Sequence, residues 1–97
     1  MAGFTRQGTF KSRERLLEAM RGKLAKLREG ALRGFTETWE RSGDADLARL
    51  SGFGARIEIT VEVSSWQCAV TLPAWLPMPQ GAIEAKFDQV FADLKDL

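Results

Sequence analysis

Polar and apolar residues alternate through the stretch from Arg56 to Leu72, which reads RIEITVEVSSWQCAVTL. Aliphatic side chains occupy every second position up to residue 63, and the alternation resumes after two serines. A period of two places the apolar side chains on one face of a strand and the polar ones on the other. Two such runs with a short polar connection predict an antiparallel hairpin. Its polar face, with Glu58, Glu62 and Gln67, is expected to be in water.

The first of two helical patterns begins after Ser12, a candidate N-cap because its side chain can accept hydrogen bonds from the free amides of the first turn. Leucine and methionine then recur every three or four residues, which gives one apolar stripe. Gly22 interrupts the segment, at a cost of about 1 kcal/mol relative to alanine. Gly30 is a candidate C-terminal stop, so the predicted helix runs from Ser12 to Glu29.

Shorter patterns fill the rest of the chain. Residues 35–41 and 46–53 predict a hairpin around a Ser-Gly-Asp turn, with a single helical turn as the alternative for the second run. Residues 1–11 predict either a short edge strand or a frayed lead-in. Apolar residues at helical spacing predict a second helix over about residues 80–95.

Together these elements predict one α+β domain over residues 1–97. Its antiparallel sheet has three to four strands, and an N-terminal and a C-terminal helix cover one face with their apolar stripes. This arrangement is a two-layer sandwich. A chain of 97 residues is long enough to bury roughly 60–70% of its unfolded surface without disulfides or metals.

The side-chain chemistry favours a protein without a catalytic site. The chain contains no histidine, so the commonest general base and metal ligand are missing, and one cysteine cannot build a zinc site. The most glycine-rich stretch, Ser51 to Gly54, is typical of a bend between strands. Glu58 and Glu62 lie about 13 Å apart along one strand, too far for a shared site. Cys68 falls on the apolar face and is expected to be a buried small hydrophobe. We therefore expect a non-enzyme without metal or cofactor.

Localisation follows from what the sequence lacks. No apolar run reaches the ~18–20 residues of a membrane span, and the start of the chain lacks the apolar stretch of a secretory signal. A single cysteine suits a reducing compartment. We expect a cytoplasmic protein without a transmembrane segment.

Positive charge is concentrated in the first part of the chain. Residues 1–41 contain ten lysines and arginines against five acidic residues, and residues 42–97 contain four against eight, giving the totals of 14 and 13. The first predicted helix and its lead-in carry most of these cations: Lys11, Arg13, Arg15, Arg21, Lys23, Lys26 and Arg28. Such a set is typical of a solvated helix face with a few ion pairs. The alternative is contact with an anionic surface, either nucleic acid phosphate or a lipid-coated particle.

The loop from Pro73 to Pro79 carries three large apolar side chains, those of Trp75, Leu76 and Met78. The prolines exclude a regular helix or strand here. Two interpretations stay open. The side chains form either a lid on the core or, if they are exposed together, an apolar contact patch.

Several segments taken in order resemble the polyhydroxyalkanoic acid system protein family. They are Trp39-Glu40, SGFGARIEITVEV (Ser51–Val63), AVTLPAWLP (Ala69–Pro77) and IEAKFDQVFADL (Ile83–Leu94). Members are small bacterial proteins whose genes lie near those for polyester storage granules. The resemblance implies a non-enzymatic protein associated with granule formation or the granule surface, with that surface or granule proteins as partners.

Two alternatives come from other classes. A small nucleic-acid-binding module would use the basic first helix, although that helix lacks interleaved aromatic residues. A self-associating domain without ligand chemistry would form a homodimer through an unpaired strand edge or the loop around Trp75.

Overall fold

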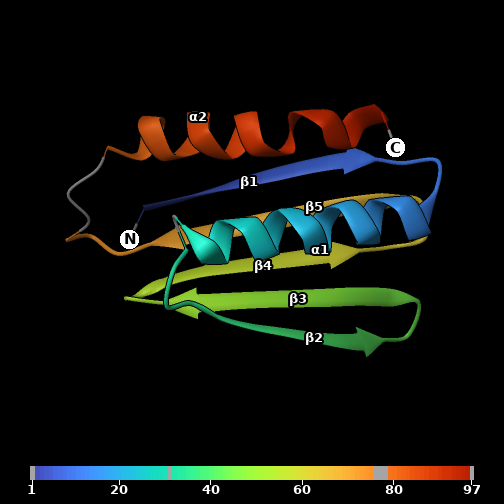
Figure 1. Ribbon diagram of the computed structural model, residues 1–97, viewed down its shortest axis with the longest axis horizontal. Coiled ribbons are helices and arrows are strands. Elements are labelled where there is room, and N and C mark those ends of the chain that lie inside the picture. Colours follow the sequence, from blue (N-terminus) through green and yellow to red (C-terminus); the bar gives the residue numbers. More distant parts are fainter. Residues whose placement is uncertain (1, 31, 76–78, 97) are drawn as a thin grey trace.

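Residues 2–30, 32–75 and 79–96, which the computed structural model describes, form a five-stranded antiparallel sheet and two α-helices (Figure 1). In chain order the elements are β1 (Ala2–Thr9), α1 (Arg13–Glu29), β2 (Thr36–Ser42), β3 (Ala45–Gly52), β4 (Ala55–Val61), β5 (Ser65–Leu72), α2 (Gln80–Phe91) and the 3-10 helix η1 (Ala92–Asp96). The α+β fold is as predicted.

The central hairpin is confirmed as β4 and β5, which lie in the middle of the strand order β1-β5-β4-β3-β2. Apolar residues face one another across this pair, for example Ile57 opposite Val70 and Ile59 opposite Cys68. Such cross-strand pairs bury together on one side of the sheet. Strands β2 and β3 form the predicted second hairpin, so the chain adopts a strand where a helical turn was the alternative.

The prediction of three to four strands is wrong, because β1 pairs with β5 and the described residues form five strands. The first helix is therefore not N-terminal, since a strand precedes it. Two glycines permit this pairing. A Cβ at Gly3 would lie 2.6 Å from the carbonyl oxygen of Val70, and one at Gly8 would lie 2.8 Å from the indole Nε1 of Trp66. These close approaches require glycine.

The core lies between one face of the sheet and both helices. Ser12 caps α1 by accepting a hydrogen bond from the amide of Arg15, as predicted. The α1 stripe then buries Leu16, Met20 and Leu24 almost completely, and these residues belong to the same cluster as the apolar residues of β3, β4 and β5. The burial of each contributes about 1.5–3 kcal/mol as an upper estimate.

Aromatic rings join α2 to the edge of the sheet that β1 forms. Phe4 of β1 packs edge-on against Phe87 at 5.5 Å between ring centroids, Phe87 contacts Phe91 at 4.3 Å, and Phe91 lies 6.4 Å from Trp66 of β5. In Figure 1, α2 runs alongside β1, whereas α1 lies over the middle of the sheet and runs roughly along β4 and β5.

Two sequence-based boundaries differ from the structure. Helix α2 ends at Phe91 rather than near residue 95, because the chain tightens into the 3-10 helix η1. Val63, expected on the apolar face, lies in the connection after β4 and is 68% exposed. The polar face is in water as predicted, with Glu62 and Gln67 exposed and Glu58 half-buried.

Candidate functional site

The basic residues of the first helix do not form one open surface. Arg13 pairs with the carboxylate of Asp46 at 2.9 Å and also donates to the carbonyl of Val61, which fixes the start of α1 to β3 and β4. Lys23 pairs with Asp93 of η1 at 2.6 Å. These two cations therefore link elements of the fold.

Two further cations of α1 hold the edge strand β2. Arg28 lies 3.6 Å from the carboxylate of Glu37. The guanidinium of Arg21 stacks 4.2 Å from the ring centroid of Trp39, whose indole donates to Glu37 at 2.6 Å. A cation over an indole face contributes about 0.5–1 kcal/mol at an exposed site. Among the described residues, Lys11, Arg15 and Lys26 remain as the predicted contact cations with neither an ion pair nor a cation–π contact.

The predicted apolar loop contributes one exposed aromatic residue within the described ranges. Trp75 is 65% exposed, and Leu76 and Met78 lie outside the described residues. A second aromatic, Phe53, is 67% exposed on the turn between β3 and β4. The sequence pattern predicts only a bend at this turn. An apolar residue between two glycines at the tip of a hairpin was the signal that could have revealed it.

Phe53 and Trp75 lie at the same end of the sheet. Gly54 follows Phe53 in the turn and lies beside Trp75. A Cβ on Gly54 would be 3.6 Å from the indole Nε1 of Trp75. On its other side, the ring of Phe53 is 6.0 Å from that of Phe35, which precedes β2. We call Phe35, Phe53 and Trp75 the aromatic tip. Phe53 and Trp75 are exposed and Phe35 is half-buried against the core, so three separate chain segments place aromatic rings at this end of the sheet.

The backbone of this turn is unusual for the residues that form it. Phe53 has φ 53° and Gly54 has φ 83°. Positive φ at both central residues is the pattern of a type I′ hairpin turn, where Asn-Gly is favoured. A phenylalanine in the left-handed region costs about 1–2 kcal/mol. The chain therefore presents a large exposed ring at a position where a smaller polar residue would be more stable.

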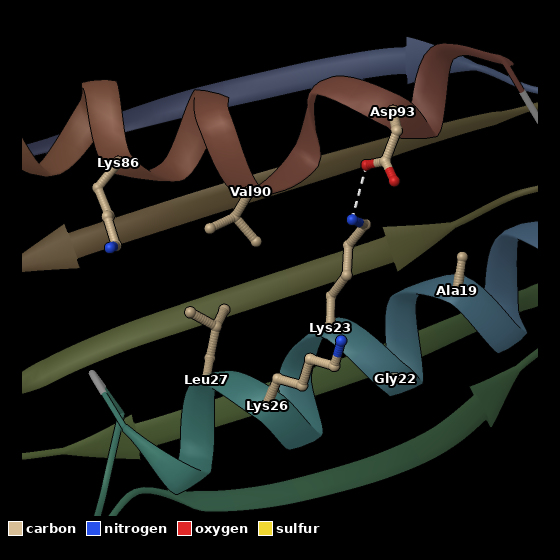
Figure 2. Close-up of a pocket in the computed structure, with 8 residues that line it drawn as sticks. All are labelled: Ala19, Gly22, Lys23, Lys26, Leu27, Lys86, Val90 and Asp93. Atoms are coloured by element: carbon tan, nitrogen blue, oxygen red, sulfur yellow. Dashed lines mark ion pairs between the residues drawn. The ribbon is translucent and has the colours of Figure 1, made fainter.

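A groove of about 630 Å³ separates α1 from α2. Its lining residues are Ala19, Gly22, Lys23, Lys26, Leu27, Lys86, Val90 and Asp93. Figure 2 shows the side chains of Leu27 and Val90 pointing toward one another across the groove, with the Lys23–Asp93 ion pair beyond them. Lys86 was absent from the predicted cation set because only the packing of the two helices places it on the same groove as Lys26. The groove thus combines apolar walls with ammonium groups.

The cysteine lies apart from both surfaces and is unsuited to nucleophilic chemistry. Cys68 is 2% exposed, and burial raises the pKa of its thiol to about 12. The thiolate, which is the reactive form, is therefore scarce at neutral pH. Its burial as a small hydrophobe is confirmed. In the described ranges, no three histidine, cysteine, aspartate or glutamate side chains come together as a metal site.

These features define a class: a small α+β protein with helices on one face of an antiparallel sheet, an aromatic tip and a basic groove. No protein-family model matches the chain, and no curated protein matches it. Among solved structures, the crystal structure of Ara h 8.0201 is similar, with a TM-score of 0.50 and 11% identity over 98% of this chain and 95% of that chain. At this identity the likeness shows the fold alone. Neither helix in the described part of the chain is long and apolar enough to cross a membrane.

Proposed function

We propose that this protein is a non-enzymatic attachment protein that binds the lipid-coated surface of a hydrophobic particle through its aromatic tip. The polyester storage granule, which the sequence resemblance suggests, is such a particle. The observation that carries the proposal is the joint exposure of Phe53 and Trp75 on adjoining turns. Rings of this kind enter the boundary between lipid headgroups and acyl chains readily.

The magnitude of this contact suits reversible binding. With about two thirds of the surface of each residue exposed, insertion would remove at most about 130 Å² per residue from water, or about 3 kcal/mol each. Association itself costs several kcal/mol, so the net affinity of the two rings is modest. Arg33 and Arg56 are exposed near the same end of the sheet. Each cation close to an anionic lipid surface adds about 1 kcal/mol.

The strain at Phe53 supports the same proposal. Its ring lies 6.0 Å from that of Phe35 and beside Gly34, while the residue is 67% exposed. Free energy gained when Phe53 binds a surface outside the protein would offset the cost of its left-handed backbone.

Co-flotation with phospholipid-coated polyester particles tests the proposal. The wild type should float with the particles, and the Phe53→Asn/Trp75→Ser variant should bind at least tenfold more weakly. Phe53→Asn creates an Asn-Gly type I′ turn, which favours the hairpin, so weaker binding would not reflect unfolding. Val63→Ser is the matched control, because Val63 is 68% exposed beyond the other end of β4.

Two outcomes would contradict this function. One is a wild-type protein that stays in the soluble fraction with anionic and zwitterionic coatings alike. The other is equal flotation of the wild type and the Phe53→Asn/Trp75→Ser variant. Plain phospholipid vesicles run in parallel separate attachment to the coat from attachment to the polyester beneath it.

A further inference from the structure

We propose that the groove between α1 and α2 binds a medium-chain fatty acid, with its carboxylate held by Lys26 and Lys86 and its chain lying along the apolar walls. This site is separate from the aromatic tip, since no residue of the tip lines the groove. The volume of about 630 Å³ falls within the roughly 300–1,000 Å³ typical of small-molecule sites.

Charge complementarity selects the head group. Lys23 is neutralised by Asp93 at 2.6 Å, whereas Lys26 and Lys86 have no acidic partner within the described residues. Both lysines line the same groove, one on each helix. A single carboxylate can accept hydrogen bonds from two ammonium groups. The carboxylate of Asp93 in the wall makes a more highly charged anion less suitable.

Gly22 provides an independent indication of an occupant. It lies in the interior of α1, where glycine is about 1 kcal/mol less favourable than alanine. A Cβ on Gly22 would have no atom of the described residues within 4 Å, apart from its own stretch of helix. The packing of the fold therefore does not require glycine here. Together with Ala19 one turn earlier, Gly22 leaves the α1 wall of the groove low enough for a chain to lie against the helix backbone.

The length of the groove limits the chain. Its lining on α1 extends from Ala19 to Leu27, which corresponds to about 12 Å along the helix axis. An extended chain advances roughly 1.2 Å per bond, as in an extended polypeptide. The groove therefore accommodates about eight to ten carbons. A phospholipid with two long chains exceeds this length, so the groove fits a free medium-chain acid.

Calorimetric titration with sodium decanoate below its micelle concentration tests the proposal on the full chain. We expect one molecule bound per protein, with amide chemical-shift changes concentrated at residues 19–27 and 86–93. Decyltrimethylammonium, which has the same chain and the opposite charge, should bind at least tenfold more weakly. Hexanoate should also bind at least tenfold more weakly, because it leaves part of the apolar wall uncovered.

Variants separate the site from general apolar association. Lys26→Gln/Lys86→Gln should weaken decanoate binding at least tenfold, and Lys11→Gln/Arg15→Gln, which removes two cations outside the groove, should leave it unchanged. Gly22→Leu should obstruct the groove without unfolding α1, because leucine favours helix more than glycine does.

Three results would overturn the proposal. They are no saturable decanoate binding, equal affinity for decanoate and decyltrimethylammonium, and unchanged affinity in the Lys26→Gln/Lys86→Gln variant. The Phe53→Asn/Trp75→Ser variant should bind decanoate as the wild type does. A failure of particle attachment and a failure of this groove are therefore distinguishable.

Discussion

Replacement of Gly22 by alanine should stabilise the protein. The residue lies inside the helix Arg13–Glu29, and a Cβ there meets no other described part of the fold within 4 Å. The substitution therefore adds neither a clash nor a packing contact, and only the backbone preference changes. That preference is about 0.8–1.0 kcal/mol in a helix interior. For a domain of this size, about 1 kcal/mol corresponds to a rise in Tm of about 4–8 °C.

Urea denaturation and thermal melting, both followed by circular dichroism at 222 nm, measure this change. The urea midpoint should rise without a change in the m-value, since the surface exposed on unfolding stays the same. Gly8→Ala is the matched control. Its Cβ would lie 2.8 Å from the buried indole of Trp66, so this substitution should destabilise by about 1–3 kcal/mol.

Two outcomes would refute this reasoning. A Gly22→Ala protein no more stable than the wild type would mean that α1 is not a regular helix at residue 22. A Gly8→Ala protein of wild-type stability would mean that β1 does not lie against Trp66.

Three further predictions concern the core, acid stability and the thiol. Leu24→Ala should cost about 2–5 kcal/mol in urea denaturation, because Leu24 is 1% exposed. The guanidinium of Arg6 holds the pKa of Glu84 and of Asp88 below its usual value. These carboxylates bind fewer protons folded than unfolded, so they stabilise the fold above their unfolded pKa of about 4. That contribution should disappear as the pH falls through the lowered values, and Arg6→Met should flatten the acid limb of a plot of stability against pH. Cys68 should resist an aromatic disulfide reagent at pH 8 until denaturant is added, and rapid labelling of the native protein would show that the thiol is accessible.

The local sequence pattern was sufficient to predict those elements whose neighbours in space are also their neighbours in sequence. The β4–β5 hairpin follows from strict alternation, and α1 follows from its stripe and the cap at Ser12. Strand β1 could not be established in this way. Gly3 and Gly8 lower its intrinsic preference for a strand, and the reason for both glycines lies some sixty residues away, at Val70 and Trp66.

The candidate surfaces were predictable only in part. Trp75 and Lys26 were recognised from composition, but their surroundings depend on how separate segments meet. Phe53 joins Trp75 because the β3–β4 turn lies beside the end of β5. Lys86 joins Lys26 because α2 packs on the same side of the sheet as α1. Neither meeting leaves a periodic signal in the sequence.

The pairing of β1 with β5 also sets the order of events when the protein is made. Strand β1 is synthesised before its partner and can pair only after residues 65–72 have been made, and α2, which clamps β1 through Arg6 and Phe4, emerges later still. Pairing over such a separation is slow because a long loop must close first. Once β5 has formed and before β1 has paired with it, the edge of β5 is uncovered, and β1 of another copy could dock there instead. Expression at lower temperature or with a cleavable solubilising partner should therefore raise the yield of folded protein.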